Sequence, residues 1–392
     1  MKKLEHKVPN LRFKDFTDDW DQRKLGEIST SFSGGTPSVK NKSYYGGKIP
    51  FIRSAEIHKD KTELFITESG LKSSSAKLIK KGTLLYALYG ATSGEVDVSN
   101  IDGAINQAIM AIFLQKDNVS FIKYYLEKNK YKIIAKYLQG GQGNLSASII
   151  KSVHINLPFT EEQLKISNLI KKVESLISLQ QRKLEQLKQL KKAMLQQLFV
   201  DKNNKQPNSR FKNFKGNWEQ HRLEEVAQVT MGQSPSSKNY TDNPNDYVLV
   251  QGNADLKSNK ISPRVWTKEI TKQVHKGEII MTVRAPVGYL AMANMDAVIG
   301  RGVAAIDGNK YLYYLLQTKL MDRTWEKLSS GSTFESISSN DIKNLEIKVT
   351  ETEEEKLITK LMNTVTYFVT LQKNNLTQLT TLKKYLLQNL FI

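Results

Sequence analysis

The 392-residue sequence contains no cysteine, which excludes disulfide scaffolds, thiol catalysis and metal sites with cysteine ligands. Its five histidines are scattered and form neither an HExxH motif nor a helical pair, so no metal site is predicted. No run of about 18 apolar residues occurs, and the first residues lack the apolar segment of a signal peptide. We therefore expect a cytoplasmic protein that neither spans nor binds a membrane.

Motifs of nucleotide-dependent and nucleophilic enzymes are also missing. No G-x4-G-K-[ST] sequence is present, so a P-loop is excluded. The glycine-rich segment at 140–144 follows a predicted helix and lacks the third glycine of a dinucleotide-binding loop. There is no serine nucleophile elbow and no Asn/Asp-Pro-Pro motif for amino methylation. We expect no catalytic residue and no cofactor in this chain.

The sequence has fewer acidic than basic residues. The sequence has 58 Lys and Arg against 39 Asp and Glu, a formal net charge of +19. Such an excess favours a polyanionic partner, for which nucleic acid ranks ahead of an anionic membrane surface, and we expect nucleic acid and no membrane partner.

The sequence contains an internal repeat. Residues 9–38 align without a gap to residues 207–236, and 13 of the 30 pairs are identical. The identical pairs include Arg12, Trp20, Leu25, Gly34 and Pro37, which recur as Arg210, Trp218, Leu223, Gly232 and Pro235. Residues 39–80 and 237–275 share little. A duplicated frame with divergent loops is therefore predicted.

Each half ends in a segment that predicts a long helix. Thr160 with Gln163, and Thr352 with Glu355, have the spacing of a capping box. Neither segment contains Pro or Gly for about 38 residues, which corresponds to about 57 Å of helix. Heptad spacing predicts a coiled-coil seam, formed by Ile166, Ile170, Val173, Ile177, Gln180, Leu184 and Leu187 and by Ile358, Met362, Val365, Val369, Gln372, Leu376 and Leu379. The alternative is an amphipathic helix lying on its own domain.

The polar residues of the seam favour an antiparallel pair. A parallel, in-register pair would place Lys191 against Lys383 in one partly buried layer, whereas antiparallel pairing separates them. It also brings Gln180 and Gln372 together, where their amides can form a hydrogen bond.

The predicted fold class is α+β: two similar mixed α/β domains at opposite ends of an antiparallel two-helix coiled coil, related by a pseudo-twofold repeat. The expected domains are 1–155 and 201–348, each followed by a coiled-coil helix, at 156–200 and 349–392. Apolar runs at 48–52, 83–89 and 108–114, with counterparts at 247–250, 278–283 and 303–306, predict strands. Helical periodicity follows at 120–138 and 310–328.

The divergent loops combine basic, aromatic and amide side chains, which are the types that contact phosphates and base edges in DNA. The candidate DNA-binding residues of the first half are Lys40, Lys42, Tyr44, Tyr45, Arg53, Lys72, Lys77, Gln142 and Asn144. Those of the second half are Lys238, Tyr240, Lys257, Arg264, Arg284, Arg301, Ser332 and Thr333. Alternatively, many of them are solvated surface residues.

Several motifs recur in one order in both halves. They are Trp20 with Leu25 and a following Gly and Thr-Pro-Ser, the Ala-Ile-Asn-Gln segment at 104–107, Leu157-Pro158 through Glu162-Gln163, and the closing segments at 190–199 and 382–391. With these motifs the sequence resembles the DNA-specificity subunit of type I restriction–modification enzymes over nearly its whole length. The second copy departs from the pattern, because Gly300-Arg301 stands where the first has Asn106-Gln107.

The resemblance implies a non-catalytic subunit whose two target-recognition domains each read half of an asymmetric bipartite site in double-stranded DNA. It also implies two methyltransferase (M) subunits that carry S-adenosylmethionine, and two restriction and translocation (R) subunits that use ATP and Mg. Three alternatives remain open at this point: a self-contained nuclease or methyltransferase, a coiled-coil adaptor or architectural DNA-binding protein, and a dimeric transcription factor.

Overall fold

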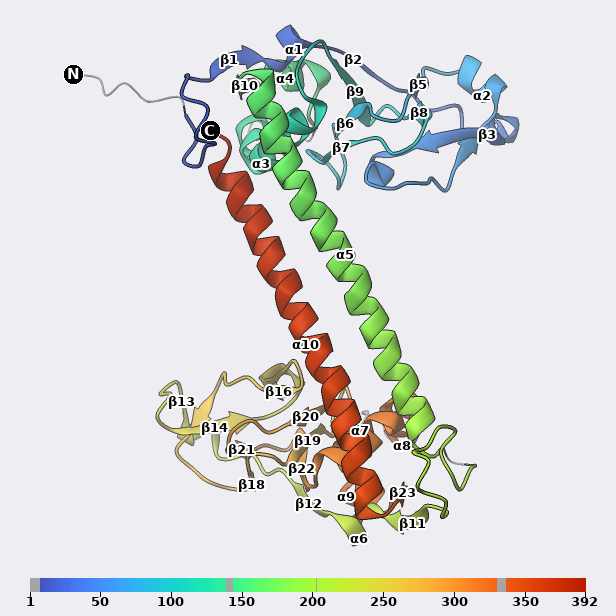
Figure 1. Cartoon of the computed structure of the whole chain (residues 1–392), viewed down its shortest axis with the longest axis vertical. Helices are drawn as coiled ribbons and strands as arrows, with labels where there is room; N and C mark the ends of the chain where they lie inside the picture. The colour runs from blue at the N-terminus through green and yellow to red at the C-terminus, as the bar shows by residue number, and fades with distance from the viewer. Residues whose placement is uncertain (1–7, 139–143, 202, 330–335) are drawn as a thin grey trace, which may run out of the picture. The chain divides into compact units, whose positions relative to one another are not determined.

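The computed structural model describes residues 8–138, 144–201, 203–329 and 336–392. The chain forms two compact units: unit 1 comprises Met1–Gln181 with Asn375–Ile392, and unit 2 comprises Arg182–Asn374. Each unit contains one globular part and a part of each long helix, α5 (Thr160–Leu198) and α10 (Thr352–Asn389) (Figure 1). No described helix is both long enough and apolar enough to cross a membrane.

The globular part of unit 1 is built from short strands and four helices of the described chain. In chain order they are β1 (Asp21–Lys24), α1 (Leu25–Ile28), β2 (Ser29–Ser33), β3 (Tyr45–Ile52), β4 (Phe65–Ile66), α2 (Glu68–Lys72), β5 (Lys77–Ile79), β6 (Leu84–Ala87), β7 (Val96–Val98), β8 (Gly103–Ile105), β9 (Ile109–Leu114), α3 (Val119–Leu138), α4 (Ala147–Lys151) and β10 (His154–Leu157).

The globular part of unit 2 has a matching order of elements. They are β11 (Glu219–Arg222), α6 (Leu223–Val226), β12 (Gln228–Met231), β13 (Tyr240–Thr241), β14 (Tyr247–Val250), β15 (Leu256–Lys257), β16 (Lys260–Ile261), β17 (Trp266–Thr267), β18 (Gln273–Val274), β19 (Ile279–Thr282), β20 (Leu290–Met292), β21 (Ala297–Ile299), β22 (Val303–Asp307), α7 (Lys310–Met321), α8 (Thr324–Ser329), α9 (Ser339–Lys343) and β23 (Glu346–Val349).

The antiparallel four-stranded sheet has the same connectivity in both units, whereas the second sheet has four strands in unit 1 and five in unit 2. A four-stranded antiparallel sheet has the order β2-β9-β6-β7 in unit 1 and β12-β22-β19-β20 in unit 2. A second sheet contains one parallel pair in each unit, β3 with β8 and β14 with β21. The internal repeat is therefore a repeat of topology as well as of sequence, and the mixed α+β class is confirmed.

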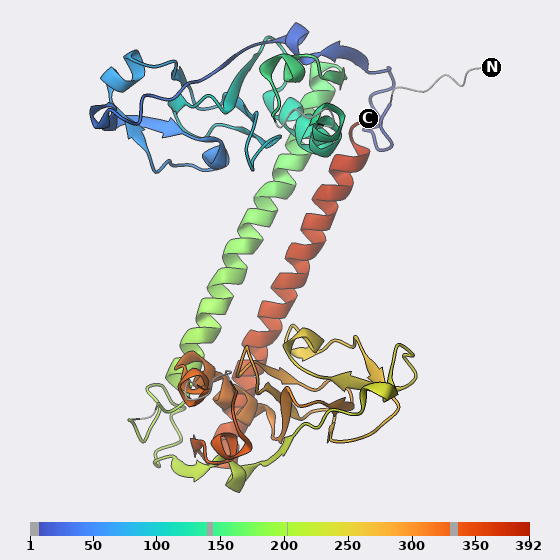
Figure 2. The same ribbon diagram turned by 180° about the vertical axis from the view of Figure 1, so that it is seen from behind.

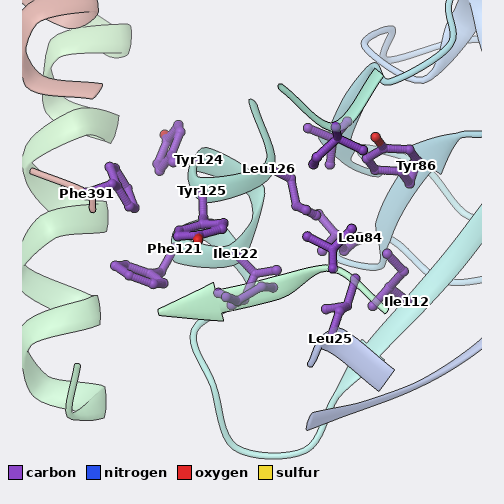
Figure 3. Packing of buried hydrophobic residues seen from close by; sticks show 14 of the residues in the cluster. Leu25, Leu84, Tyr86, Ile112, Phe121, Ile122, Tyr124, Tyr125, Leu126 and Phe391 are labelled. Atoms are coloured by element: carbon purple, nitrogen blue, oxygen red, sulfur yellow. The ribbon is translucent and has the colours of Figure 1, made fainter. Parts of the chain in front are cut away.

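The four-stranded sheet of unit 1 is apolar on both faces because each face lies against a separate core. Leu84, Tyr86 and Ile112 belong to the core shared with α3 and the long helices, whereas Leu85 and Ala111 alternate with them and face a smaller core under β3 and β8. Figure 3 shows Leu84, Tyr86 and Ile112 on the helix side of the sheet. Trp20 and Trp218, the tryptophans that recur in the two halves of the sequence, are both buried in the cores of their units.

The two long helices are antiparallel within unit 1. Ile166 and Ile170, near the start of α5, share one core with Leu386 and Leu390, near the end of α10. The two segments lie side by side in Figure 1 and in the reverse view of Figure 2. Phe391 closes this core, with its ring 5.0 Å from that of Phe121 (Figure 3). The antiparallel orientation is confirmed.

Unit 2 repeats this packing with the helices exchanged. Ile358 and Met362, near the start of α10, share a core with Leu195 and Leu198, near the end of α5. Phe199 takes the place of Phe391, with its ring 5.5 Å from that of Tyr311.

All fourteen predicted seam residues are shielded from solvent. Eight are buried, and the remaining six, Ile177, Gln180, Leu187, Val369, Leu376 and Leu379, are half-buried. Gln180 Oε1 and Gln372 Nε2 are both buried without a hydrogen-bond partner among the described residues. The hydrogen bond expected between their amides stays a prediction.

Two local predictions are wrong. Thr160 and Thr352 are the first helical residues. The side chain of Gln163 accepts from Asn118 N and donates to Asp117 Oδ1 at 2.8 Å and to Pro158 O at 3.0 Å, which is not the bonding of a capping box. The single helix expected over 310–328 is two helices, because Arg323 between them has a left-handed φ of 58° that an α-helix cannot continue through.

Candidate nucleic-acid interface

A set of loops meets at the carboxyl end of the parallel strands in each unit, and we call this place the junction. In unit 1 the junction consists of residues 34–36, 53, 88–89 and 105–108. It is held by backbone hydrogen bonds, from Gly34 N to Ile109 O (3.3 Å), Gly35 N to Ile105 O (3.2 Å), Asn106 N to Ile52 O (3.2 Å), Leu88 N to Ala108 O (2.8 Å) and Leu145 N to Leu88 O (3.0 Å). The ends of parallel strands are where α/β proteins place their ligand-binding loops.

The junction of unit 2 consists of residues 232–234, 251, 283–284 and 299–302, and it has the same hydrogen bonds. They run from Gly232 N to Val303 O (2.9 Å), Gln233 N to Ile299 O (2.8 Å), Gly300 N to Val250 O (2.8 Å), Val283 N to Gly302 O (2.9 Å) and Ile337 N to Val283 O (3.0 Å). Five bonds with the same pattern fix nine pairs of equivalent positions. The backbone frame of the junction is therefore duplicated.

The glycine shared by the two halves is required by this close packing. A Cβ atom on Gly34 would lie 1.9 Å from the carbonyl oxygen of Ile105, and one on Gly232 would lie 2.1 Å from that of Gly300. Any other residue would push the loop away from the parallel strands.

The side chains on this common frame differ between the units. Tyr89 and Gln107 of unit 1 stand where unit 2 has Arg284 and Arg301. Gln107 accepts a hydrogen bond from the Thr36 hydroxyl, and the matching Ser234 accepts one from Arg301 N at 3.2 Å. The departure noted in the second copy of the sequence therefore lies at the junction.

Arg53 is a candidate DNA-binding residue that is already bound by two carboxylates. Its guanidinium lies 3.0 Å from Glu56 Oε2 and 2.8 Å from Glu63 Oε2. Burial opposes ionisation of Glu56, but hydrogen bonds from Arg53 and from the backbone N–H of Glu63 outweigh it and lower its pKa to about 2. Those carboxylates raise the pKa of Arg53.

Arg284 and Arg301 are exposed and have no acidic side chain within 4.0 Å in the part of the chain that the structure describes. Arg264, by comparison, lies 3.9 Å from the buried Asp255. Unpaired guanidinium groups on a frame at strand ends are suited to bind acceptors on nucleic acid.

The other candidates lie on loops, on short strands and at the end of α2. Lys40, Lys42, Lys72 and Lys77 are exposed, as are Asn144, Lys238, Tyr240 and Lys257. Tyr44 and Tyr45 are half-buried, and the Tyr45 hydroxyl donates to Pro37 O at 2.6 Å. Hydrogen bonds to Ser73 and Asn41 lower the pKa of Tyr44. Gln142, Ser332 and Thr333 lie outside the described residues.

Five junction positions were missed by sequence reasoning: Thr36, Tyr89, Gln107, Ser234 and Gln251. The signal that points to three of them was the repeat itself, because Thr36 and Ser234 occupy one repeated motif and Gln107 lies in another. Tyr89 and Gln251 carry no such signal, and only strand pairing brings them to the junction.

Comparison with known proteins agrees with these features. Residues 17–189 and 215–381 match the family described as the type I restriction modification DNA specificity domain. The putative type I restriction enzyme MjaX specificity subunit of Methanocaldococcus jannaschii is 27% identical over 395 residues, which cover 94% of this chain and 92% of that protein.

Solved structures share the fold. The S subunit of a type I restriction–modification system from M. genitalium has a TM-score of 0.67 and 16% identity, covering 98% of this chain and 99% of that one. A chain from a study of complex assembly and conformational transition of the type I R-M system has a TM-score of 0.61 and 22% identity, with 95% and 97% covered. With both halves matched by one family, the chain belongs to the type I restriction–modification DNA specificity subunits.

Proposed function

We propose that each unit reads one half of an asymmetric bipartite site in double-stranded DNA, and that α5 and α10 set the distance between the half-sites. The observation that carries this proposal is the duplicated junction, whose backbone is the same and whose side chains differ. One frame with two sets of side chains is suited to two different half-sites. For both units to approach one face of the duplex, the half-site centres are expected about one helical turn, or roughly 10 bp, apart.

The chain acts as a specificity subunit without catalysis of its own, consistent with its family. Methylation is assigned to two M subunits with S-adenosylmethionine, and translocation and cleavage to two R subunits with ATP and Mg, all in the cytoplasm. The chain's own residues supply the binding surfaces. An adaptor without sequence specificity is not favoured, because the family is defined by DNA specificity.

An apolar face of the long helices supports docking of the M subunits. Leu176, Leu179 and Leu190 on α5 are exposed although they are large and apolar, and Phe368, Leu371 and Leu382 on α10 are their repeats. The three α5 positions fall within about 60° of one another on a helical wheel and lie outside the seam. Exposed apolar stripes on a soluble protein mark interaction surfaces, and the repetition of this stripe fits two copies of one partner.

The specificity role is tested by single-molecule methylation mapping of genomic DNA from cells with and without this chain and its M subunit. Modified adenines should appear within one two-part asymmetric motif only when the chain is present. Unchanged methylation, or a compact undivided motif, would contradict the proposal.

Docking is tested with L176D/L179D and F368D/L371D in pull-down of the M subunit. Both variants should lose M binding, because two carboxylates in an apolar contact are left desolvated. The control is S178D, which adds a carboxylate on the polar side of α5 and should retain binding. Equal binding by all variants would assign the M subunit to another surface.

A further inference from the structure

Two arginines of unit 2 come together without a carboxylate to neutralise them. Arg284 follows Val283, whose amide donates to the carbonyl of Gly302 at 2.9 Å, and Arg301 directly precedes Gly302. Both side chains are exposed, and no described acidic group lies within 4.0 Å of either. Two like charges on adjoining segments repel each other, which costs stability. A partner rich in hydrogen-bond acceptors would offset this repulsion by binding both guanidinium groups.

The other arginines of unit 2 show how unusual this pair is. Arg210 forms a bidentate pair with Glu354, Arg264 faces Asp255, and Arg323 lies 3.8 Å from Glu326. Besides the pair itself, only Arg222 is exposed without an acidic partner among the described residues of the globular part, and it lies on β11, away from the junction.

The matching positions of unit 1 decide between phosphate and base as the acceptor. The DNA backbone is the same in every sequence, so a phosphate contact made by the common frame would be needed equally by both units. Yet Tyr89 and Gln107 stand in unit 1 where the arginines stand in unit 2. A pair of positions that is dicationic in one unit and neutral in the other, on an identical backbone, is suited to the part of the site that differs, which is the base sequence.

Resting on the proposed function, we propose that Arg284 and Arg301 read guanine in the half-site of unit 2, through O6 and N7 in the major groove. The planar guanidinium matches these two acceptors in a bidentate contact, which no other base offers in that pattern. Gln107 and Tyr89 place no guanine requirement on the half-site of unit 1. The two residues are thus determinants of specificity that distinguish one half of the site from the other.

The test uses the full chain in complex with its M subunit. Binding is measured for the mapped site and for duplexes in which each G·C pair of either half is replaced, at one salt concentration. R284Q and R301Q each keep an amide donor but remove the bidentate fork, and R301K keeps the charge. R222Q removes an arginine of the same unit outside the junction and serves as the control.

Wild type and R222Q should prefer guanine at the contacted positions of one half by about 10- to 100-fold, the discrimination expected of a good bidentate contact. R284Q and R301Q should each lose this preference at one position while keeping the preferences of the other half, and R301K should weaken it, because lysine reaches the same acceptors without the planar fork. Methylation mapping of R301Q should then show the motif relaxed in one half only.

Two outcomes overturn the inference while leaving the specificity role intact. One is an R301Q variant that keeps every base preference and binds all duplexes more weakly, which identifies a phosphate contact. The other is a mapped half-site without any G·C pair in the half affected by the variants. If the wild-type complex yields no two-part motif at all, it is the proposed function that fails. Base preferences that are kept in the other half distinguish loss of reading from loss of folding, because an unfolded chain would lose both.

Discussion

The lysine that interrupts the seam has opposite surroundings in the two units. In unit 1, Lys383 of α10 lies 2.8 Å from Glu127 and 2.9 Å from Glu174. In unit 2, the repeated Lys191 of α5 lies over the ring of Tyr314, 5.6 Å from its centroid, and no carboxylate pairs with it among the described residues. Burial opposes the charge on Lys383, but the two carboxylates outweigh it and raise its pKa, whereas burial lowers the pKa of Lys191.

The difference arises from single substitutions on a common frame. Glu174 of α5 corresponds to Thr366 of α10, and Glu127 of α3 to Gln317 of α7. The Tyr124 hydroxyl accordingly donates to Glu174 at 2.5 Å, while the matching Tyr314 hydroxyl bonds to Asn363 and Thr366. The repeat thus preserves the path of the backbone but not the interactions of the side chains, as it does at the junction.

An arginine near the start of each half forms an ion pair with a glutamate of the following long helix. Breaking this pair should lower stability by the same amount in both units, and this loss should be the largest of the expected effects. Arg12 with Glu162, and Arg210 with Glu354, are bidentate pairs with both distances of each pair at 2.8 Å and almost fully buried carboxylates. E162A and E354A should each cost about 3–5 kcal/mol in free energy of unfolding, because an arginine is left buried and unpaired.

Hydrogen exchange measured by mass spectrometry resolves the two units and checks both values. The exposed neighbours provide matched controls: E161A and E353A should change stability by less than about 0.5 kcal/mol. A cost confined to one unit would show that the two pairs are not equivalent.

Replacing the seam lysines should give effects of opposite sign. K383M should destabilise unit 1 by about 1–2 kcal/mol, because Glu127 and Glu174 lose a shared cation and keep Lys123 as their one cation among the described residues. K191M should leave unit 2 unchanged or stabilise it by up to about 1 kcal/mol, because it removes a buried amine without a carboxylate. Each variant is the control for the other in chemical denaturation, and equal losses would refute the electrostatic difference.

The same two lysines should respond to alkaline pH in opposite directions. The pKa of Lys191 is lowered in the folded state, so the unfolded chain binds more protons as pH rises towards 10.5, and stability of unit 2 rises over that window. The pKa of Lys383 is raised, so its contribution is present below pH 10.5 and is lost above it as its folded-state pKa is passed.

This pH dependence is measured as the difference between wild type and the corresponding Lys→Met variant, by hydrogen exchange corrected for intrinsic rates. The difference cancels other groups, including Lys128, whose pKa burial lowers to about 8. The difference in free energy of unfolding of unit 2 between wild type and K191M should become smaller as pH rises. A difference that becomes larger would show that Lys191 gains a partner in solution.

The smallest expected effect is at His58. This residue lies two positions after the buried Glu56, and the residue two positions after the buried Asp255 of unit 2 is Lys257. His58 Nδ1 lies 2.7 Å from Asp97 and Nε2 lies 3.2 Å from Glu95. The hydrogen bond to Asp97 outweighs burial and raises the pKa of His58, so its contribution is full below pH 6.5 and is lost as pH rises through the folded-state pKa.

Because His58 is half exposed, H58Q should change stability by well under about 1 kcal/mol. NMR titration of His58 should give a pKa above 6.5, which falls in D97N. A histidine that titrates at or below 6.5 would show that the pair with Asp97 is not formed in solution.

Local pattern was sufficient for the features that repeat along the chain. Heptad spacing predicts both long helices and all shielded seam positions, and the polarity of Lys191 and Lys383 predicts their antiparallel orientation. Apolar runs predict two strands of each four-stranded sheet to within a few residues, β6 and β9 in unit 1 and β19 and β22 in unit 2, but not the other two strands of each sheet. Sequence failed at Arg323, where one left-handed residue ends a helix without any local signal, and at Gln163, which bonds to Asp117 from a distant part of the chain.

The sequence by itself determined the duplication, the helices and the class of partner, because periodicity, repetition and net charge are properties of the chain alone. Only the tertiary structure decided which arginines have carboxylate partners. Arg53 and Arg301 both lie beside predicted strands in the sequence, but folding gives Arg53 two carboxylates and gives Arg301 none among the described residues. Likewise Tyr89 and Gln107 meet through strand pairing, which depends on contacts between residues that are distant in sequence.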